Sequence, residues 1–262
     1  MSTTDPERHD VAALLKAGRY EEALHLLGQL FDEAESEPAP SRTRYFMTMF
    51  EWKLLLEEHP PAQAPLRARR DAQVERLLAG AEYCGTAPGG GDAEYDYHRA
   101  SRFSLIYEMN GLLRDECSTY ETFSQLDATQ PVQARRYAHM ALPAVVAMQD
   151  FALAERYCGD PLDLLHNVNV GAHELPLFPP PWEAPRLAAD LSNLVKAVRI
   201  GIAVLRGRGK DAEADRLREA MLDGLEAAEL KDLARRELDQ PGTITREVVA
   251  HQMAEEDRRR AL

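Results

Sequence analysis

Seven residues near the N-terminus indicate the architecture of this 262-residue chain: Gly18-Arg19-Tyr20-Glu21-Glu22-Ala23-Leu24. A glycine, an aromatic residue two positions on and an alanine three positions after that are typical of two short antiparallel helices that pack closely. Apolar residues continue the helical spacing on both sides of this turn, namely Val11, Leu14, Leu15, Leu27 and Leu30. Because one such pair cannot bury its apolar face alone, the turn predicts further helix pairs stacked beside it.

The composition is typical of a folded, water-soluble protein. Apolar residues make up 45% of the chain and charged residues 29%, and the length allows a large core in one or two domains. No apolar run approaches the roughly 18 residues of a membrane span, and the N-terminus carries no apolar signal region. Cys84, Cys117 and Cys158 are widely spaced, which argues against a disulfide framework or a zinc site. We expect a cytoplasmic protein without a metal or other cofactor.

The net charge is −13 and the isoelectric point is near 5.1. An acidic chain repels nucleic acid and anionic membranes at long range, so neither is expected as a partner. The sequence also contains no P-loop, no Gly-x-Ser-x-Gly and no dinucleotide-binding fingerprint. We therefore assign no catalytic residue and do not expect an enzyme.

Nearly every segment of the chain has a helical pattern, and strand signals are almost absent. The spacing predicts an all-α fold with helical hairpins at about 6–35, 43–80, 93–127, 131–158 and 184–229. A final helix is expected to begin near Thr243 or Thr245. The hairpin turns are predicted at Gly18, at Pro60-Pro61, at Gln149-Asp150 and at Gly207-Arg208-Gly209.

Two segments interrupt the helical pattern. The Gly- and Pro-rich loop 85–92 is the predicted boundary between N-terminal hairpins in 1–84 and C-terminal hairpins in 93–262, with one continuous domain as the alternative. The segment 159–185, which contains three consecutive prolines, is predicted to be an irregular strap. We expect this strap either to cover a groove between hairpins or to act as a lid or a partner-docking segment.

The first hairpin resembles a tetratricopeptide repeat. The small and apolar positions of that 34-residue unit are filled, in order, by Val11, Leu14, Gly18, Tyr20, Ala23, Leu27 and Leu30. The family's Trp and closing Pro are missing. The fourth hairpin matches more weakly, through Leu142, Val145, Gln149, Phe151, Ala154 and Cys158, and the fifth through Ile202, Leu205, Gly209 and Ala214. The resemblance implies a right-handed α-solenoid of about six antiparallel hairpins.

In this family the first helix of each unit lines a concave groove. Transferred to this chain, the groove positions include an excess of basic and imidazole side chains: Arg8, Lys16, Arg136, His139, Lys196, Arg199 and Arg206. A locally basic groove in an acidic protein would select an acidic or carboxylate-bearing segment. The alternative is that these long side chains cover apolar surface on solvated faces.

Aromatic residues gather in two clusters around residues 45–52 and 95–107. Phe46 and Phe50 share one helical face, and Phe103 and Tyr107 share another, so these pairs are interpreted as core stripes. Aromatic residues away from such stripes are candidate anchors in an interface. The candidates are Trp52, Tyr97 and Trp182.

Two other sets of polar residues are candidates for a metal site and for an acid–base pair. Glu247, His251 and Glu255 share one face of the last helix, which suits either a metal site or, in our preferred interpretation, a solvated charged face. Glu94 and His98 share another helix face and would need a pocket to act as an acid–base pair.

These patterns predict a protein- or peptide-binding adaptor. One alternative is a self-associating scaffold, in which a homodimer forms through an apolar face of a terminal hairpin. Another is an enzyme or small-ligand binder with its site under the strap 159–185.

Overall fold

Helices form the regular secondary structure of residues 8–87 and 99–260, which are the residues that the computed structural model describes, with side chains from residue 11 onward. Within these ranges the only strand-like pairs are two isolated bridges, Ser41–Arg99 and Tyr83–Ser101. The predicted all-α class is therefore confirmed. The chain divides into two compact units, Met1–Ala144 and Val145–Leu262, called unit 1 and unit 2 below.

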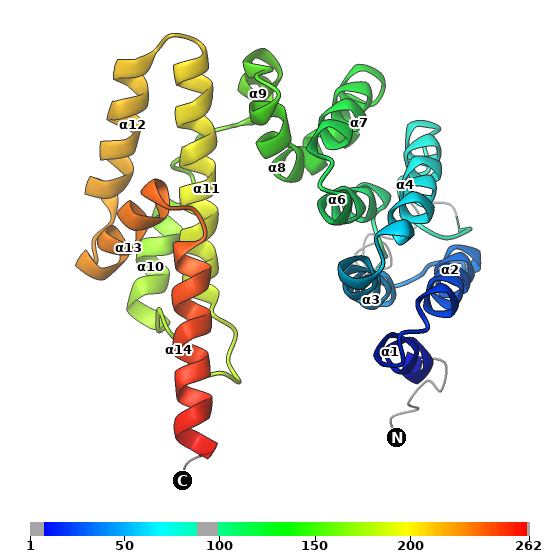
Figure 1. Cartoon of the computed structure of the whole chain (residues 1–262). Helices are drawn as coiled ribbons and strands as arrows, with labels where there is room; N and C mark the ends of the chain where they lie inside the picture. The colour runs from blue at the N-terminus through cyan, green and yellow to red at the C-terminus, as the bar shows by residue number, and fades with distance from the viewer. Residues whose placement is uncertain (1–7, 88–98, 261–262) are drawn as a thin grey trace. The chain divides into compact units, whose positions relative to one another are not determined.

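Unit 1 contains the first hairpins of the chain (Figure 1). Its helices are α1 (Arg8–Lys16), α2 (Tyr20–Ser36), α3 (Arg42–Glu58), α4 (Gln63–Leu78), α6 (Arg102–Leu113), α7 (Glu116–Thr129) and most of α8 (Pro131–Ala147), with the 3-10 turn η1 (Pro60–Ala62) between α3 and α4. The predicted turns at Gly18 and at Pro60-Pro61 are both present.

The turn at Gly18 closes α1 as the sequence predicts. Gly18 has a φ of +69°, a left-handed conformation that glycine adopts without steric cost. The Gly18 amide donates to Leu15 O at 3.0 Å and the Arg19 amide donates to Leu14 O at 2.9 Å. These two bonds satisfy the last carbonyls of α1 in a Schellman motif. The chain reverses at once, and Ala23 of α2 is completely buried against the first helix pair.

The core of unit 1 crosses the predicted domain boundary at 85–92. Buried residues from before this loop, such as Leu27 and Trp52, belong to the same apolar cluster as Leu105 and Met109, which follow it. The prediction of a boundary at 85–92 was therefore wrong. The reason is that α6 packs against both α3 and α4, a long-range contact that loop composition does not report.

The inward face of α3 is the opposite of the predicted one. Tyr45 and Trp52 are 3% and 0% exposed, whereas Phe46 and Phe50 are 58% and 47% exposed. Because α3 carries apolar residues around most of its circumference, periodicity alone could not select the buried face. Phe103 of α6 is buried as predicted, but Tyr107 is 39% exposed.

Unit 2 is built around its longest helix, α11. Its helices are α9 (Phe151–Tyr157), α10 (Leu165–Glu174), α11 (Arg186–Gly207), α12 (Asp211–Gly224), α13 (Ala228–Asp239) and α14 (Thr243–Arg260). Helix α11 contacts all the others (Figure 1) and supplies Leu191, Leu194, Val195 and Val198 to the core. At Gly207 a side chain would lie within 2.4 Å of the Phe151 ring, so a glycine is needed where α9 meets α11.

The predicted strap 159–185 is less irregular than expected. Its middle forms α10, which is held to the α12–α13 connection because Asn169 Nδ2 donates to Gly224 O at 2.8 Å and Asn169 Oδ1 accepts from the Glu226 amide at 3.2 Å. The non-helical parts of the predicted strap are residues 159–164 and 175–185, and Leu177 of the second part is buried in the unit 2 core. Helix α13 was also missed, although Gly224 before it and Pro241-Gly242 after it are helix-breaking residues.

Candidate functional site

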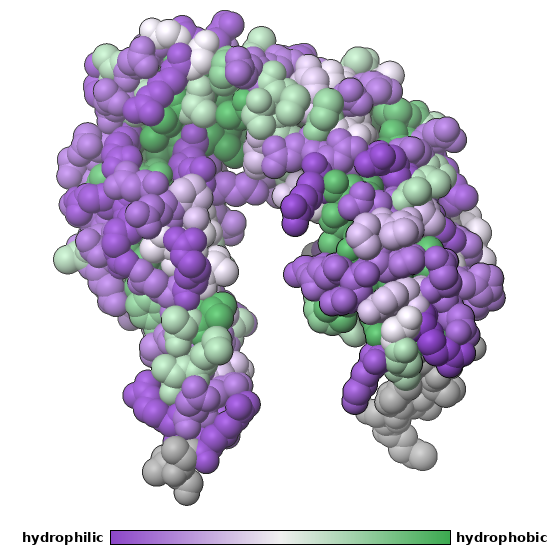
Figure 2. Space-filling view, viewed as in Figure 1, coloured by the Kyte–Doolittle hydropathy of each residue, from purple (hydrophilic) through white to green (hydrophobic). Residues whose placement is uncertain are grey.

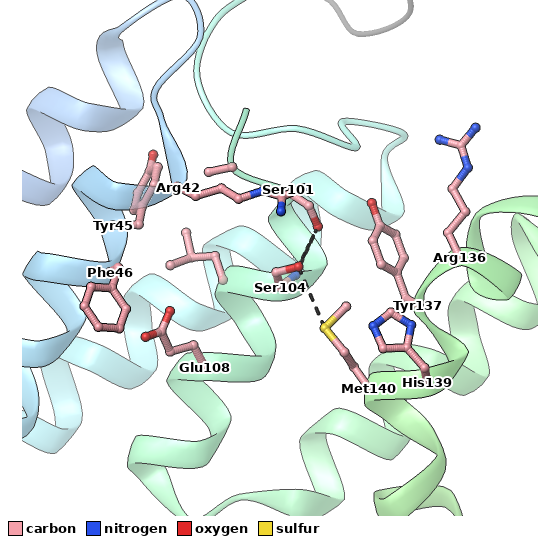
Figure 3. Close-up of a pocket in the computed structure, with 12 residues that line it drawn as sticks. Arg42, Tyr45, Phe46, Ser101, Ser104, Glu108, Arg136, Tyr137, His139 and Met140 are labelled. Carbon is pink, nitrogen blue, oxygen red and sulfur yellow. Dashed lines mark hydrogen bonds between the residues drawn. The ribbon is translucent and has the colours of Figure 1, made fainter. Parts of the chain in front are cut away.

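A surface groove runs between three helices of unit 1. Its first part is a cavity of about 530 Å³ whose floor is formed by α6 and the residues before it, with walls from α3 and α8 (Figure 3). The floor comprises Ala100, Ser101, Ser104, Leu105 and Glu108, the α3 wall Arg42, Tyr45 and Phe46, and the α8 wall Arg136, Tyr137, His139 and Met140.

A second cavity, of about 630 Å³, continues from the first between α6 and α8. Both cavities are lined by Glu108 and Met140, so they form one depression that we call the unit 1 groove. The second part adds Tyr107, Arg114 and Pro143, among others, to the lining. The lining of the groove thus follows α6 along most of its length, from Ser101 to Leu112.

Hydrogen bonds and ring contacts fix the two sides of the groove. Ser101 caps α6, because its Oγ accepts from the Ser104 amide at 3.2 Å. Ser104 Oγ lies 3.0 Å from Ser101 Oγ and 3.8 Å from Met140 Sδ, which joins α6 to α8 (Figure 3). The rings of Phe103 and Tyr137 stack at 4.8 Å. These contacts hold the α8 wall at a defined position over α6.

The cations of the groove are held by specific acceptors. Arg136 Nη1 donates to Glu82 Oε1 at 2.8 Å, and this hydrogen bond raises the pKa of Arg136. The same carboxylate oxygen accepts from Tyr137 OH at 3.2 Å. Arg42 Nε donates to Arg99 O at 3.3 Å. Because the Arg136 side chain is 60% exposed, its other guanidinium donors face solvent at the groove.

Glu108 lies at the junction of the two cavities and is half-buried. Its carboxylate is directed toward Phe46 in the close-up view (Figure 3). Burial raises the pKa of Glu108 above the ordinary glutamate value. The groove therefore combines cations on its rim with one partly desolvated acid on its floor.

The structure brings two of the seven predicted groove residues together. Arg136 and His139 line the same cavity. Lys16 is exposed on α1, outside the lining residues, and the side chain of Arg8 lies outside the described residues. The remaining three are exposed on α11 of unit 2, where Arg206 pairs with Asp215 at 3.1 Å: Lys196, Arg199 and Arg206. A single groove that contains all seven stays a prediction.

The predicted aromatic anchors have three different outcomes. Trp52 is completely buried in the unit 1 core, where its Nε1 donates to Ala62 O at 3.5 Å, so its assignment as an anchor was wrong. Trp182 is 64% exposed, with the Arg259 guanidinium 4.9 Å from its ring centroid. Tyr97 lies outside the described residues.

Sequence reasoning missed three lining residues that define the groove. Phe46 was assigned to the core, and Arg42 and Glu108 were not singled out. The available signal was the spacing of Phe46, Phe50 and Leu54, which form one continuous stripe on α3. This stripe is exposed, but the sequence does not distinguish it from the buried stripe of the same helix.

Of the two sets of polar residues considered as chemical sites, the set on the last helix contacts other side chains, and the set at Glu94 and His98 lies outside the described residues. Glu247 accepts from Arg236, Glu255 pairs with Arg258, and the His251 ring contacts the Phe178 ring in a tilted arrangement with the centroids 5.6 Å apart. Across residues 8–87 and 99–260, no cluster of three metal-ligating side chains is present. Glu94 and His98 fall outside those ranges.

In the described part of the chain, none of the helices has the length and apolarity needed to cross a bilayer. Comparisons of the chain with protein-family models, with curated proteins and with solved structures gave no match.

Proposed function

We propose that the chain is a peptide-binding adaptor and that unit 1 holds its ligand in the unit 1 groove. The observation that carries this proposal is the lining of one groove by α3, α6 and α8, with the exposed ring of Phe46 and the cation Arg42 on its α3 wall and the cation Arg136 on its α8 wall. Apolar surface next to charged donors is the usual composition of a peptide-recognition groove.

The lining suggests the chemistry of the ligand. Phe46 and Met140 offer apolar surface to an aromatic or aliphatic side chain. Arg42, Arg136 and His139 offer donors to carboxylates. Guanidinium groups bind carboxylates with charge-assisted, often paired hydrogen bonds. The ligand is therefore a segment with an apolar anchor next to acidic residues, and its acidic part lies toward α8 and away from Glu108.

A tetratricopeptide-like solenoid would explain why these three helices share a surface. In such an arrangement the first helices of successive hairpins pack side by side along the concave face. Contacts between α1 and α3 and between α3 and α6 agree with this order. The three free cysteines agree with a reducing, cytoplasmic location.

Fluorescence anisotropy with a labelled synthetic peptide tests the proposal. The probe carries Phe-Leu flanked by Asp and Glu, and its matched control carries Asn and Gln in their place. We expect the acidic probe to bind, the amide control to bind at least about tenfold more weakly, and Phe46→Ala and Arg136→Glu to reduce binding similarly.

Arg135→Glu is the control variant, because Arg135 is the exposed neighbour of Arg136 on α8 but does not line the cavity. Circular dichroism spectra establish that the variants stay folded. Equal loss of binding in the Arg135 and Arg136 variants would place the interaction outside the groove. Equal affinity for the acidic and amide peptides would overturn the charge assignment.

A further inference from the structure

Helix α14 exposes a stripe of four residues that its own unit leaves uncovered. Arg246, Val249, Met253 and Glu256 follow one another at spacings of three, four and three residues, which keeps them on one side of the helix. Val249 is 48% and Met253 61% exposed. Apolar surface over the middle of α14 is visible in Figure 2, and the surface becomes hydrophilic at its C-terminal turns. We call these four residues the α14 stripe.

The opposite side of α14 is already in use. Ile244 and Val248 are buried in the unit 2 core, and the ring of His251 contacts the ring of Phe178 in the non-helical segment 175–185. The α14 stripe is therefore not the face that attaches the helix to its own unit. Two exposed apolar residues flanked by opposite charges remain for a partner.

The order of residues in the α14 stripe is self-complementary. When a second α14 is laid antiparallel with its Met253 opposite Val249, its Glu256 comes opposite Arg246, and the same two contacts recur across the two-fold axis. An isologous dimer requires this property, since each contact in it occurs twice. The spacing also matches the three–four alternation by which helices pack along a seam.

A cavity beside the α14 stripe gives room for the side chains of the second helix. It has a volume of about 390 Å³ and lies between α11 and α14. Its α11 wall consists of Asn193 and the small residues Ala188, Ala189 and Ser192, and its α14 wall includes Val248 and Val249. Small residues let a second helix approach closely.

We propose that this surface binds a second copy of the chain, with α14 packed antiparallel on α14 of the other copy. Val249 and Met253 form the apolar centre, and two Arg246–Glu256 ion pairs lie at its ends and fix the orientation. Arg246 and Glu256 are exposed, and their present partners are local: Arg246 donates to Thr243 Oγ1 at 2.9 Å and to Pro241 O at 3.3 Å, and Glu256 pairs with Arg260 at 3.3 Å. Exchanging such contacts for intermolecular ones has little energetic cost.

Charge reversal and mixing test the proposal with the full chain. Light scattering coupled to size-exclusion chromatography over a range of micromolar concentrations is expected to give twice the chain mass of 29.4 kDa. Arg246→Glu alone and Glu256→Arg alone each place two like-charged pairs in the interface. Each is expected to weaken self-association at least about tenfold.

An equimolar mixture of the R246E chain and the E256R chain is the decisive sample. The R246E chain carries an acid at both ends of the stripe and the E256R chain a base at both ends, so a mixed dimer has an opposite-charge pair at each end. The mixture is therefore expected to regain the dimer mass. The double variant R246E/E256R is expected to dimerise alone. A third variant, Arg216→Glu on the exposed face of α12, is the control and is expected to stay dimeric.

A wild-type chain that is monomeric throughout the concentration range would overturn the proposal. A dimer that tolerates all single charge reversals would overturn the assigned surface. Peptide binding is measured on the same samples, because the α14 stripe lies in unit 2 and the unit 1 groove in unit 1. Monomeric variants that still bind the acidic probe would separate the two activities.

Discussion

The guanidinium of Arg102 donates from Nη1 to Glu35 Oε2 at 3.1 Å and thereby joins α6 to α2 across 67 residues of sequence. Both side chains are nearly inaccessible, at 2% and 9% exposed. Glu35 also accepts from Tyr45 and Arg76, and Arg102 also donates to Ala81 O at 2.9 Å and to Tyr83 O at 2.7 Å. This network ties the chain before loop 85–92 to the chain after it.

Removing the charge of Glu35 is expected to destabilise unit 1. Glu35→Gln keeps the shape of the side chain but leaves the buried Arg102 without a carboxylate. We expect the free energy of unfolding at pH 7 to fall by about 3 kcal/mol, measured by urea denaturation. Glu33→Gln is the control, since Glu33 lies on the same helix, is exposed and faces Arg44 at 3.6 Å.

The effect of Glu35→Gln should depend on pH. Burial opposes ionisation of Glu35, but hydrogen bonds from Tyr45 and Gln73 and the Arg102 charge together hold its pKa below the ordinary value. A carboxylate whose pKa is lower in the folded than in the unfolded protein stabilises the folded protein at pH values above its ordinary pKa. This stabilisation is lost as the pH falls through the pKa of the folded protein. The difference in the free energy of unfolding between the unmodified protein and Glu35→Gln should therefore become smaller below about pH 4. A difference that is constant with pH would contradict the ionic origin of the effect.

The two tryptophans should differ sharply in their contribution to stability. Trp52 is completely buried and Trp182 is 64% exposed. Trp52→Ala is expected to lower the free energy of unfolding by about 3–5 kcal/mol, because it leaves a large cavity. Trp182→Ala should change it by less than about 0.5 kcal/mol, as is usual at exposed sites. Tryptophan fluorescence gives a second measurement. In Trp182→Phe only the buried Trp52 emits, so the emission maximum should shift to the blue relative to the unmodified protein. In Trp52→Phe only the exposed Trp182 emits, so the maximum should shift to the red.

The three cysteines should react with thiol reagents in order of access. Burial, with a smaller effect of the Glu35 charge, raises the pKa of Cys84 to about 12, so little thiolate is present at neutral pH. Cys117 is exposed, although its contact with Glu121 raises its pKa, and Cys158 is half-buried. We expect Cys117 to be labelled first in the native protein and Cys84 only after unfolding. Peptide mass spectrometry locates the labels, and rapid native labelling of Cys84 would contradict its burial.

Glu108→Gln should stabilise the protein at neutral pH. Burial raises the pKa of Glu108 in the folded state, so the folded protein disfavours its charged form. The resulting loss of stability is present at pH values above the raised pKa of the folded protein. It disappears when the pH falls below the ordinary pKa that Glu108 has in the unfolded protein. The variant should therefore have a higher Tm at pH 7 and the same Tm below about pH 4.

The matched control for Glu108→Gln is Glu57→Gln, which changes an exposed acid of unit 1 that lines neither cavity of the groove. We expect Glu108→Gln, but not this control, to raise affinity for the acidic probe peptide, because it removes a negative charge from the groove floor. A lower Tm of Glu108→Gln at pH 7 would show that the carboxylate has a stabilising role instead.

The helices and turns of this chain follow largely from local sequence. Gly18 adopts the left-handed conformation that ends α1, and Pro60-Pro61 separates α3 from α4. These turn predictions succeeded because backbone propensity and helical period act over a few residues. Arg136 and His139 line a cavity, and their role in binding a ligand stays a prediction.

The sequence by itself determined that the chain is helical and where most of its helices begin and end. Tertiary structure alone decided that Trp52 rather than Phe46 is buried, that α6 closes the core begun by α2, and that Glu108 and Arg42 line one groove. The physical reason is that helical propensity is local, whereas the face a helix buries depends on partners far away in sequence. On a helix such as α3, which has apolar residues on several sides, the helices that pack against it determine which side is buried.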